Sequence, residues 1–306
     1  YRDYHLDFWM TIDAATPANT VFKTIPDVNR NFDINCASCH FTGFSIAAGT
    51  LAGEHVASAV ADPNGTVHPL TGLQQELNVG CETCHGPGSE HQAAGGGLGV
   101  AIVTPGRLPA ERETALCAQC HSRPKGNDSF GAKTDSPLNL DDKMLFPGTS
   151  RADYLTNHTS RNDATTSDFW ADGIHSKSHH QQTTDFIKSA KYRNGSNLMT
   201  CTSCHDVHAP GTDRHQLSGA SDDILCLSCH ATVDSGAHQV EKTGSSLHGG
   251  APAKCIECHN VKTAKSGAGP ALASDGGDIS SHLFDVPLAA TDAMPIPFNN
   301  SCGLCH

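Results

Sequence analysis

The fourteen cysteines of this 306-residue chain are the residues with the clearest chemistry, because all of them follow one repeated pattern. They form seven Cys-x-x-Cys pairs, each followed directly by a histidine, and no cysteine is left over. Two thiols at this spacing can form thioethers with the two vinyl groups on one edge of a porphyrin, and the adjacent histidine can then ligate the iron. The predicted attachment cysteines are Cys36, Cys39, Cys81, Cys84, Cys117, Cys120, Cys201, Cys204, Cys226, Cys229, Cys255, Cys258, Cys302 and Cys305. The predicted proximal ligands are His40, His85, His121, His205, His230, His259 and His306.

Other uses of a Cys-x-x-Cys pair fit this sequence poorly. One such pair could be a redox disulfide or half of a zinc site. Neither use needs the histidine that follows, and neither would repeat it seven times without exception. A disulfide scaffold would leave irregular spacings. The sequence therefore predicts seven haem c groups with their irons, no disulfide and no free thiol.

Each iron has a second axial position, and the residue that fills it sets the chemistry. Methionine there raises the reduction potential, histidine lowers it, and an open position permits catalysis. The chain has four methionines, but thirteen of its twenty histidines remain after the proximal ligands are assigned. Bis-histidine ligation at most or all irons is therefore the economical interpretation. Histidines near a motif, such as His208 and His248, are better candidates than His158 and His215 in polar stretches or His68 before a proline.

Composition indicates a fold built around the cofactors rather than around apolar side chains. Seven haems in 306 residues leave about 44 residues for each, which is far less than an ordinary domain provides. Aromatic residues make up only 6% of the chain, whereas it has 29 glycines and 16 prolines. We expect mostly irregular structure with short α-helices and little β-structure, organised around a closely packed chain of haems.

The spacing of the motifs suggests three regions. The interval of 84 residues between Cys117 and Cys201 separates three motifs from four, and intervals of 25 and 29 residues later in the chain imply haems packed against one another. The predicted regions are 1–125 (an N-terminal arm and three haems), 126–195 (a loop-rich connector) and 196–306 (four haems). Short helices are expected at 73–77, at 109–116, where a proline precedes acidic residues, and at 183–192.

Charge and hydropathy limit the possible partners and locations. The formal net charge is −12 with histidine neutral, and haem propionates add negative charge, so nucleic-acid binding is not expected. The charge favours either solubility alone or positively charged partners. No stretch is apolar for long enough to span a bilayer. Because haem is joined to such motifs outside the cytoplasm, we expect a leader to have been removed before Tyr1 and the mature protein to be extracellular or at the cell surface, or alternatively periplasmic.

Several stretches of the sequence resemble known multihaem proteins. The segments 35–44, 81–91 and 116–123 resemble the cytochrome c554-like multihaem family. The segments 185–192 and 200–208 are similar to pentahaem and decahaem electron carriers, and 281–287 resembles a ligand-bearing stretch of related chains. The resemblance covers most of residues 30–306, although its specificity lies mainly in the haem motifs.

This resemblance implies a set of distal ligands. Five of them would be His91, His208, His238, His248 and His282. The cluster of His175, His179 and His180 would supply a sixth, with His179 or His180 favoured. The seventh would be His55 or His5. Some members of the family have one five-coordinate haem, so an open site stays an alternative.

Three functions remain open at this level. The chain also resembles extracellular cytochrome filaments, in which a ligand is often donated across the subunit boundary; a motif at residues 302–306 and His5 in an aromatic-rich arm at 1–9 suit that hypothesis. Its partners would be other copies of itself, or else redox proteins and an external electron acceptor. A soluble periplasmic shuttle is the alternative. A nitrite- or hydroxylamine-converting enzyme is not expected, because such enzymes often replace one proximal histidine with lysine and all seven motifs here end in histidine.

Overall fold

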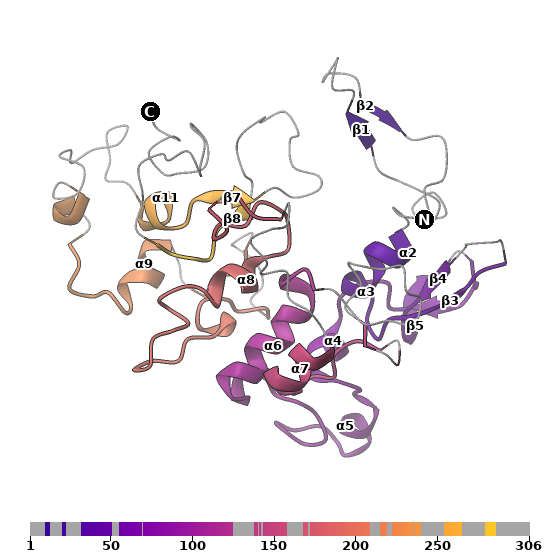
Figure 1. Ribbon diagram of the computed structural model, residues 1–306. Helices are drawn as coiled ribbons and strands as arrows, with labels where there is room; N and C mark the ends of the chain where they lie inside the picture. The colour runs from indigo at the N-terminus through magenta and orange to yellow at the C-terminus, as the bar shows by residue number, and fades with distance from the viewer. Residues whose placement is uncertain are drawn as a thin grey trace. The chain divides into compact units, whose positions relative to one another are not determined.

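The computed structural model describes most of the chain (Figure 1). The described residues are 10–12, 20–22, 32–50, 55–68, 70–124, 138–139, 141, 143–157, 168–170, 172–208, 215–218, 222–234, 236–239, 254–264 and 279–285. Contacts within the chain divide it into two compact units, Tyr1–Arg161 and Asn162–His306. The first unit holds three Cys-x-x-Cys-His motifs and the second holds four. The division falls inside the region 126–195 that the sequence predicts to be a connector.

The first unit consists of short helices and two-stranded antiparallel sheets. Strand β1 pairs with β2, β3 with β4, and β5 with β6. The strands are β1 (Met10–Ile12), β2 (Thr20–Phe22), β3 (Ser45–Ala48), β4 (His55–Ser58), β5 (Ala61–Val67) and β6 (Gln74–Gln75). The helices are α2 (Phe32–Asn35), α3 (Ala37–His40), α4 (Cys81–His85), α5 (Ser89–Ala93), η2 (Pro105–Arg107), α6 (Ala110–His121) and α7 (Arg151–Asn157).

Two small apolar clusters stabilise this unit. One gathers five buried residues around α3 and β4, namely Ala37, Phe41, Phe44, Ala57 and Leu138. The other joins α6 to α7 through Ala115, Ala118, Leu145 and Tyr154. Such clusters bury little apolar area compared with the core of an ordinary domain of this length. Among the described residues of this unit, the buried apolar side chains thus gather in two small clusters.

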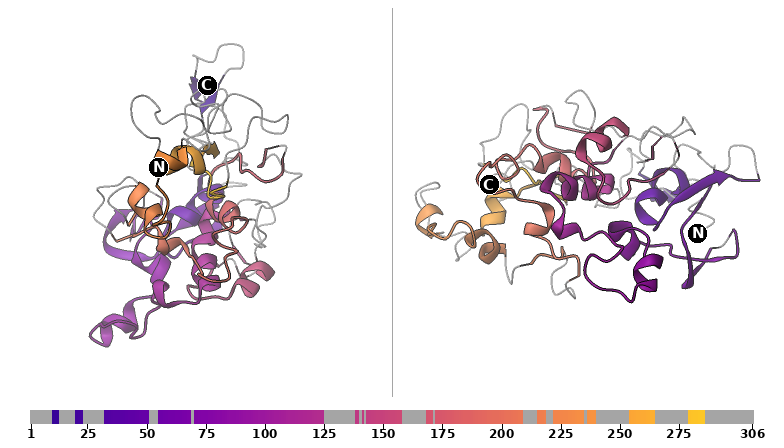
Figure 2. Two further views of the ribbon diagram at one scale, coloured as in Figure 1. Left: turned by 90° about the vertical axis from the view of Figure 1, so that its left-hand side faces the viewer. Right: turned by 90° about the horizontal axis from the view of Figure 1, so that it is seen from below.

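The described residues of the second unit form short helices and short strands only (Figure 2). Strands β7 and β8 pair in an antiparallel manner, and isolated bridges join Phe169 to Ser176 and His205 to Leu217. The elements are α8 (Gln182–Phe186), η3 (Cys201–Ser203), α9 (Asp222–Leu227), α11 (Cys255–His259), β7 (Lys262–Ala264) and β8 (Ile279–Ser280).

The fold confirms the predicted class of mostly irregular structure with short helices and little sheet. Helix α6 begins directly after Pro109 and has Glu111 and Glu113 in its first turn, which are the features that predicted it. The predicted helix at 183–192 is present only in its first part, as α8. No helix among the described residues is long and apolar enough to cross a membrane.

The predicted helix at 73–77 is wrong. Residues Gln74 and Gln75 pair with β5 instead, and the Gln75 side chain is buried. Its Oε1 accepts a hydrogen bond from the main-chain N–H of Ala59 (3.0 Å). Pairing with the preceding strand β5 thus outweighs the local helix preference of a run of glutamine, glutamate and leucine.

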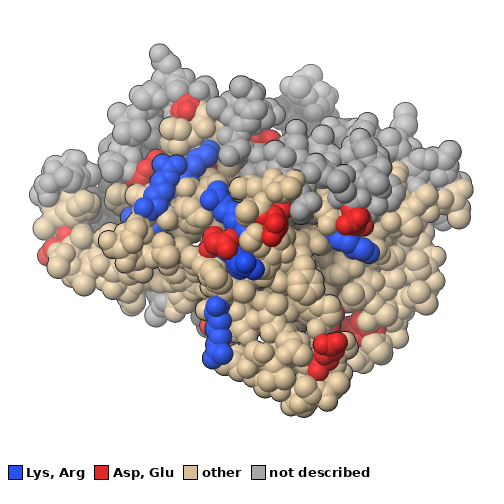
Figure 3. Space-filling model, turned by 60° about the horizontal axis from the view of Figure 1, so that its bottom comes forward, with Lys and Arg blue, Asp and Glu red and all other residues tan. Residues whose placement is uncertain are grey.

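The charged residues do not form a broad basic surface on the face drawn in Figure 3, where lysine and arginine are interspersed with aspartate and glutamate. Much of the described surface of this face carries neither sign of charge. A basic stripe would be the footprint of a nucleic-acid-binding protein. No such stripe is present among the described residues of this face.

Candidate functional site

Six of the seven Cys-x-x-Cys-His motifs lie in described residues, and each forms a helical turn or part of a short helix. The motif residues are found on α3, α4, α6, η3, α9 and α11 or in the turn that follows. Even where no α-helix is formed, the histidine N–H donates to the carbonyl of the first cysteine, from His205 to Cys201 and from His230 to Cys226 (both 3.0 Å). A helical turn places positions i, i+3 and i+4 on one face. Both thiols and the imidazole of each motif can therefore meet one porphyrin. The seventh motif, residues 302–306, lies outside the described residues.

Three of the predicted proximal histidines are held through Nδ1 by main-chain carbonyl groups. His85 Nδ1 donates to the main-chain carbonyl of Val103 (2.8 Å), and His205 Nδ1 donates to that of His215 (2.8 Å). In the same way, His259 Nδ1 donates to the main-chain carbonyl of Asp285 (2.9 Å). Because a carbonyl oxygen only accepts, the proton of each neutral ring lies on Nδ1 and the lone pair lies on Nε2. A hydrogen bond of this kind is the usual outer support of a metal-ligating histidine, since it fixes both the tautomer and the ring orientation.

Two pairs of imidazole rings face each other at one common distance. The ring centroids of His205 and His282 are 6.2 Å apart with an interplanar angle of 19°. Those of His238 and His259 are also 6.2 Å apart, at 27°. In each pair one member is a predicted proximal ligand and the other a predicted distal one.

This distance can be compared with the centroid separation of two imidazole rings that ligate one iron. A first-row metal lies about 2.0–2.1 Å from an imidazole nitrogen, and the ring centre lies about 1 Å beyond, so two axial rings have centroids roughly 6 Å apart. Both ring pairs fit this spacing. His282 also donates through Nδ1 to the carbonyl of Ser280 (3.1 Å), which leaves the lone pair on Nε2. The residues therefore fit a haem with an imidazole on each side.

The other predicted distal ligands are placed as follows. His91 lies on α5, and its Nδ1 donates to the carbonyl of Val100 (2.7 Å), so its ring has the tautomer of a ligand. His55 lies on β4, and the exposed His208 lies in the turn after the fourth motif. His179 and His180 contact each other through their Nδ1 atoms, with rings at 86°. His5 and His248 lie outside the described residues, and these assignments all stay predictions.

Two other histidines use both ring nitrogens in contacts with the protein. His68 is fully buried; its Nε2 donates to Ala57 O (2.8 Å), and its Nδ1 accepts from the N–H groups of Leu70 and Thr71 (3.2 Å each). His175 has Nδ1 2.6 Å from Asp172 Oδ2 and Nε2 3.1 Å from Asp285 Oδ2. Neither ring offers a nitrogen to an iron in this arrangement, which leaves His179 and His180 as the ligand candidates of their cluster.

The electrostatic environment of His175 keeps its imidazole charged. Burial opposes the charge, but the hydrogen bonds that the ring donates to Asp172 and Asp285, together with the negative charges of these carboxylates, outweigh it and raise the pKa of His175 to about 9. A protonated imidazole has no lone pair for a metal. His175 is thus a cation held between two carboxylates at neutral pH.

Cysteines of different motifs lie close together within each unit. In the first unit Cys120 interacts with Cys39, and Cys84 lies near Cys117. The third motif therefore neighbours both the first and the second. In the second unit Cys226 lies near both Cys204 and Cys255, so the fifth motif neighbours the fourth and the sixth. The short intervals between motifs in the sequence predict such neighbouring cofactors.

Comparison with known proteins agrees with this arrangement. The family described as "Doubled CXXCH motif" matches residues 193–235, which contain the fourth and fifth motifs. The multihaem cytochrome MtrA of Shewanella baltica (strain OS185) is 28% identical over 163 residues, which are 53% of this chain and 44% of MtrA. The chain thus resembles multihaem c-type cytochromes, both in its repeated motifs and in this relative. The chain spans less than half the length of this curated relative.

One solved structure shows the same fold as this chain. The outer cell wall cytochrome OcwA superposes with a TM-score of 0.57 at 21% identity, covering 97% of this chain and 65% of OcwA. An undecahaem cytochrome from the S-layer of Carboxydothermus ferrireducens matches with a TM-score of 0.36 at 21% identity, over 93% of this chain and 43% of that protein.

The sequence did not reveal the carbonyl groups that hold the histidines, on Val103, His215 and Asp285. Every residue has a main-chain carbonyl, so no residue type marks this role. The sequence also gave His175 no role separate from its two neighbours. The acidic residues at positions 172 and 285 were the only available signal, and position 285 is distant in the chain.

Proposed function

We propose that this cytochrome carries seven haem c groups and conducts electrons along them, with histidine on both sides of most or all irons. The two imidazole pairs at 6.2 Å are the observation that supports this most strongly. Haem c, when bound, supplies a one-electron couple whose potential is lowered by bis-histidine ligation. The same ligation fills both axial positions, so the protein leaves a substrate no iron to bind.

The chain orients the ligand rings and brings neighbouring haem motifs close together. Carbonyl groups fix the rings of His85, His205 and His259 through Nδ1, which favours rapid one-electron exchange because the ligands need not reorganise. The contacts between cysteines support an order of first, third and second haem in one unit and fourth, fifth and sixth in the other. Sequence order is therefore not the order of the electron path in the first unit.

We further propose that the protein works at the cell surface or outside the cell and associates there with copies of itself into a conducting filament. The fold shared with an outer cell wall cytochrome supports the location, and the resemblance to filament-forming cytochromes supports the association. A periplasmic shuttle of equal haem content is the alternative, and a nitrite- or hydroxylamine-converting enzyme is a weaker one.

Mass and spectroscopy test the haem proposal. The intact mass of the purified protein should correspond to seven covalently bound haems, and its electron paramagnetic resonance (EPR) spectrum should contain low-spin ferric signals only. A mass that corresponds to six haems or fewer would contradict the count. A high-spin signal together with turnover of nitrite or hydroxylamine would favour the enzyme.

Electron microscopy at increasing protein concentration tests the association. Filaments with a regular subunit repeat are expected. Monomeric particles at every concentration would contradict the filament and leave the shuttle as the better proposal.

A further inference from the structure

The segment 281–285 contributes to two of the proposed haem sites. His282 faces His205, the proximal ligand of the fourth motif, at 6.2 Å between ring centroids. Three residues later, the carbonyl of Asp285 accepts the Nδ1 hydrogen bond of His259, the proximal ligand of the sixth motif (2.9 Å). Any movement of this segment would therefore change the ligand geometry of the fourth and sixth haems together.

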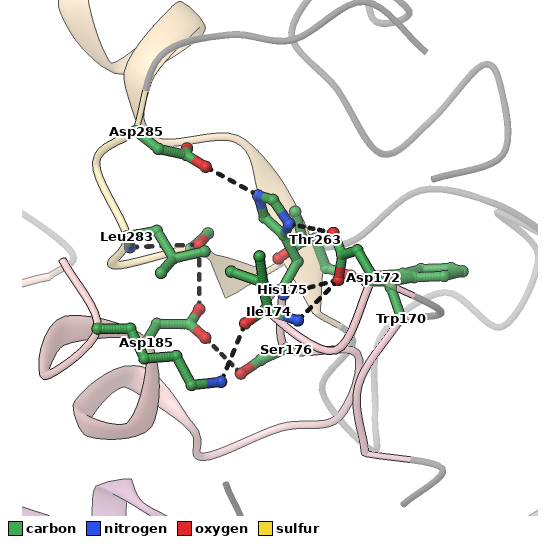
Figure 4. Close-up of polar contacts among 11 residues, drawn as sticks. Trp170, Asp172, Ile174, His175, Ser176, Asp185, Thr263, Leu283 and Asp285 are labelled. Atoms are coloured by element: carbon green, nitrogen blue, oxygen red, sulfur yellow. Dashed lines mark hydrogen bonds and ion pairs between the residues drawn. The ribbon is translucent and has the colours of Figure 1, made fainter. Parts of the chain in front are cut away.

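A second segment holds this one at both ends (Figure 4). At one end Ser281 Oγ donates to Asp185 Oδ2 (3.0 Å), directly beside His282. At the other end Asp285 Oδ2 lies 3.1 Å from Nε2 of His175. The two side chains that hold the segment 281–285, those of Asp185 and His175, both come from the segment 172–188. Neither residue is a predicted haem-attachment residue or a proposed iron ligand.

The segment 172–188 is itself held in place by polar contacts. Asp185 is 2% exposed, and its other oxygen accepts from Ser176 Oγ (2.6 Å). Nδ1 of His175 donates to Asp172 Oδ2 (2.6 Å), so the imidazole lies between two carboxylates. Lys188 adds a hydrogen bond to the carbonyl of Ile174 (3.1 Å) and lies 4.0 Å from the ring centre of Phe169.

The buried position of these groups makes their contacts strong. The side chain of His175 is 13% exposed, and charge-assisted hydrogen bonds of partly buried groups are stronger than neutral ones. Loss of Asp285 would leave the largely buried imidazole of His175 without one of its two carboxylate partners, whereas the Asp285 side chain itself is 44% exposed. The segment 281–285 is therefore restrained by contacts that a single substitution can release.

We infer that His175, through Asp285, and Asp185, through Ser281, are positioning residues that set the axial-ligand geometry of the fourth and sixth haems together. This inference rests on the proposed bis-histidine ligation. His175 fixes the carbonyl that orients His259, and Asp185 fixes the main chain beside His282. The reduction potentials of both haems then depend on one polar network, through the orientation of their ligands and the strength of the Nδ1 hydrogen bond.

Two ligand substitutions first identify the signals of the two haems. His282→Met and His238→Met should each raise the potential of one haem, because methionine raises the potential of an iron that histidine lowers. A redox titration followed by visible and EPR spectra then marks one signal in each variant. If neither substitution changes any signal, the proposed ligand pairs are wrong, and this outcome is separate from a failure of the network.

The network is then tested with His175→Gln, Asp285→Asn and Ser281→Ala. We expect each to shift one or both of the marked signals and to leave the other five unchanged, with seven haems retained by mass. Ser281→Thr keeps the hydroxyl and should restore the wild-type signals. The double variant His175→Gln with Asp285→Asn should shift no further than either single variant, because both remove the same contact.

His68→Gln is the matched control, since it also removes a buried histidine with two hydrogen-bonded nitrogens but lies in the other unit. It should leave both marked signals in place. The inference is overturned if His175→Gln and Ser281→Ala leave the marked signals unchanged, or if they shift all seven alike. If His175→Gln loses haem, the marked signals are compared instead in Asp285→Asn, Ser281→Ala and Ser281→Thr.

Discussion

A histidine in this chain has one of two roles according to what its ring nitrogens contact. Where Nδ1 donates to a carbonyl, as in His85, His205 and His259, Nε2 carries the lone pair and the ring can ligate. Where both nitrogens contact protein groups, as in His68 and His175, the ring supports the fold. Hydrogen bonding at the second nitrogen thus separates ligand candidates from structural histidines better than distance from a motif does.

At this scale the ligand pair of the fourth haem can be broken selectively. His282→Ala should remove the distal ligand while the thioethers and His205 remain, so that one of seven haems becomes high-spin and binds carbon monoxide after reduction. EPR spectra and carbon monoxide difference spectra measure this change. His215→Ala is the control, because the main-chain carbonyl that holds His205 is retained and the exposed side chain alone is removed. A fully low-spin spectrum for His282→Ala would argue against the ligand pair.

The raised pKa of His175 predicts a loss of stability at high pH. The folded-state pKa of about 9 exceeds the unfolded value of about 6.5, so the stabilisation is complete below pH 6.5 and is lost as the pH rises through 9. The charged groups that face His175 are Asp172, Asp285 and Asp185, with Lys188 beside them.

Between pH 6.5 and 10 the free energy of unfolding should fall by up to about 3 kcal/mol from this group. Denaturant unfolding of the haem-loaded protein at both pH values measures the loss. His175→Gln provides the comparison, because it lacks the titrating ring and should lose less stability over the same range. An equal loss in both proteins would assign the pH dependence to other groups.

At the scale of the element, the helical turn places the two cysteines and the histidine of each motif on one face. It depends on neighbouring residues only, so the sequence predicts it. The spacing of two cysteines and a histidine predicts one face of a turn, as α4 and α11 illustrate. The partner of each turn is not local. His282 could be assigned as a ligand only through resemblance, and its pairing with His205 follows from the folded path of the chain. The helix predicted at 73–77 fails for a different reason, because residues 74 and 75 pair with the preceding strand β5 and this pairing outweighs their helix preference.

The junction of α6 and α7 offers a test of how much a single element contact stabilises the first unit. Tyr154 is 2% exposed, and its hydroxyl lies 2.9 Å from Ser122 Oγ and donates to Ala118 O (3.2 Å). Tyr154→Phe should lower the free energy of unfolding by about 1 kcal/mol, since Ser122 keeps its own bond to Ala118 O (2.7 Å).

Denaturant unfolding of the haem-loaded protein measures this change. Leu155→Ala, at an exposed position of the same helix, is the control and should change stability by much less. A larger loss in the free energy of unfolding for Leu155→Ala than for Tyr154→Phe would show that α7 is stabilised mainly by the face that carries Leu155.

At the scale of the whole molecule, the cofactors and the charge of the chain decide how it meets its partners. The apolar clusters of the described residues are small, and the proposed haems would complete the interior. The chain carries a net charge of −12, to which the propionates add. The proposed electron carrier would therefore attract cations and repel anions.

This charge predicts how the rate of electron exchange depends on salt. The reduced protein should reoxidise faster with the cation hexaammineruthenium(III) at low ionic strength than at high, because salt screens the attraction beyond about 10 Å at 0.1 M. The anion ferricyanide should show the opposite trend, since repulsion is screened in the same way. Stopped-flow rates between low and high salt should differ several-fold for each reagent, and parallel trends for both would mean that local charge at the haem edges, rather than net charge, steers the encounter.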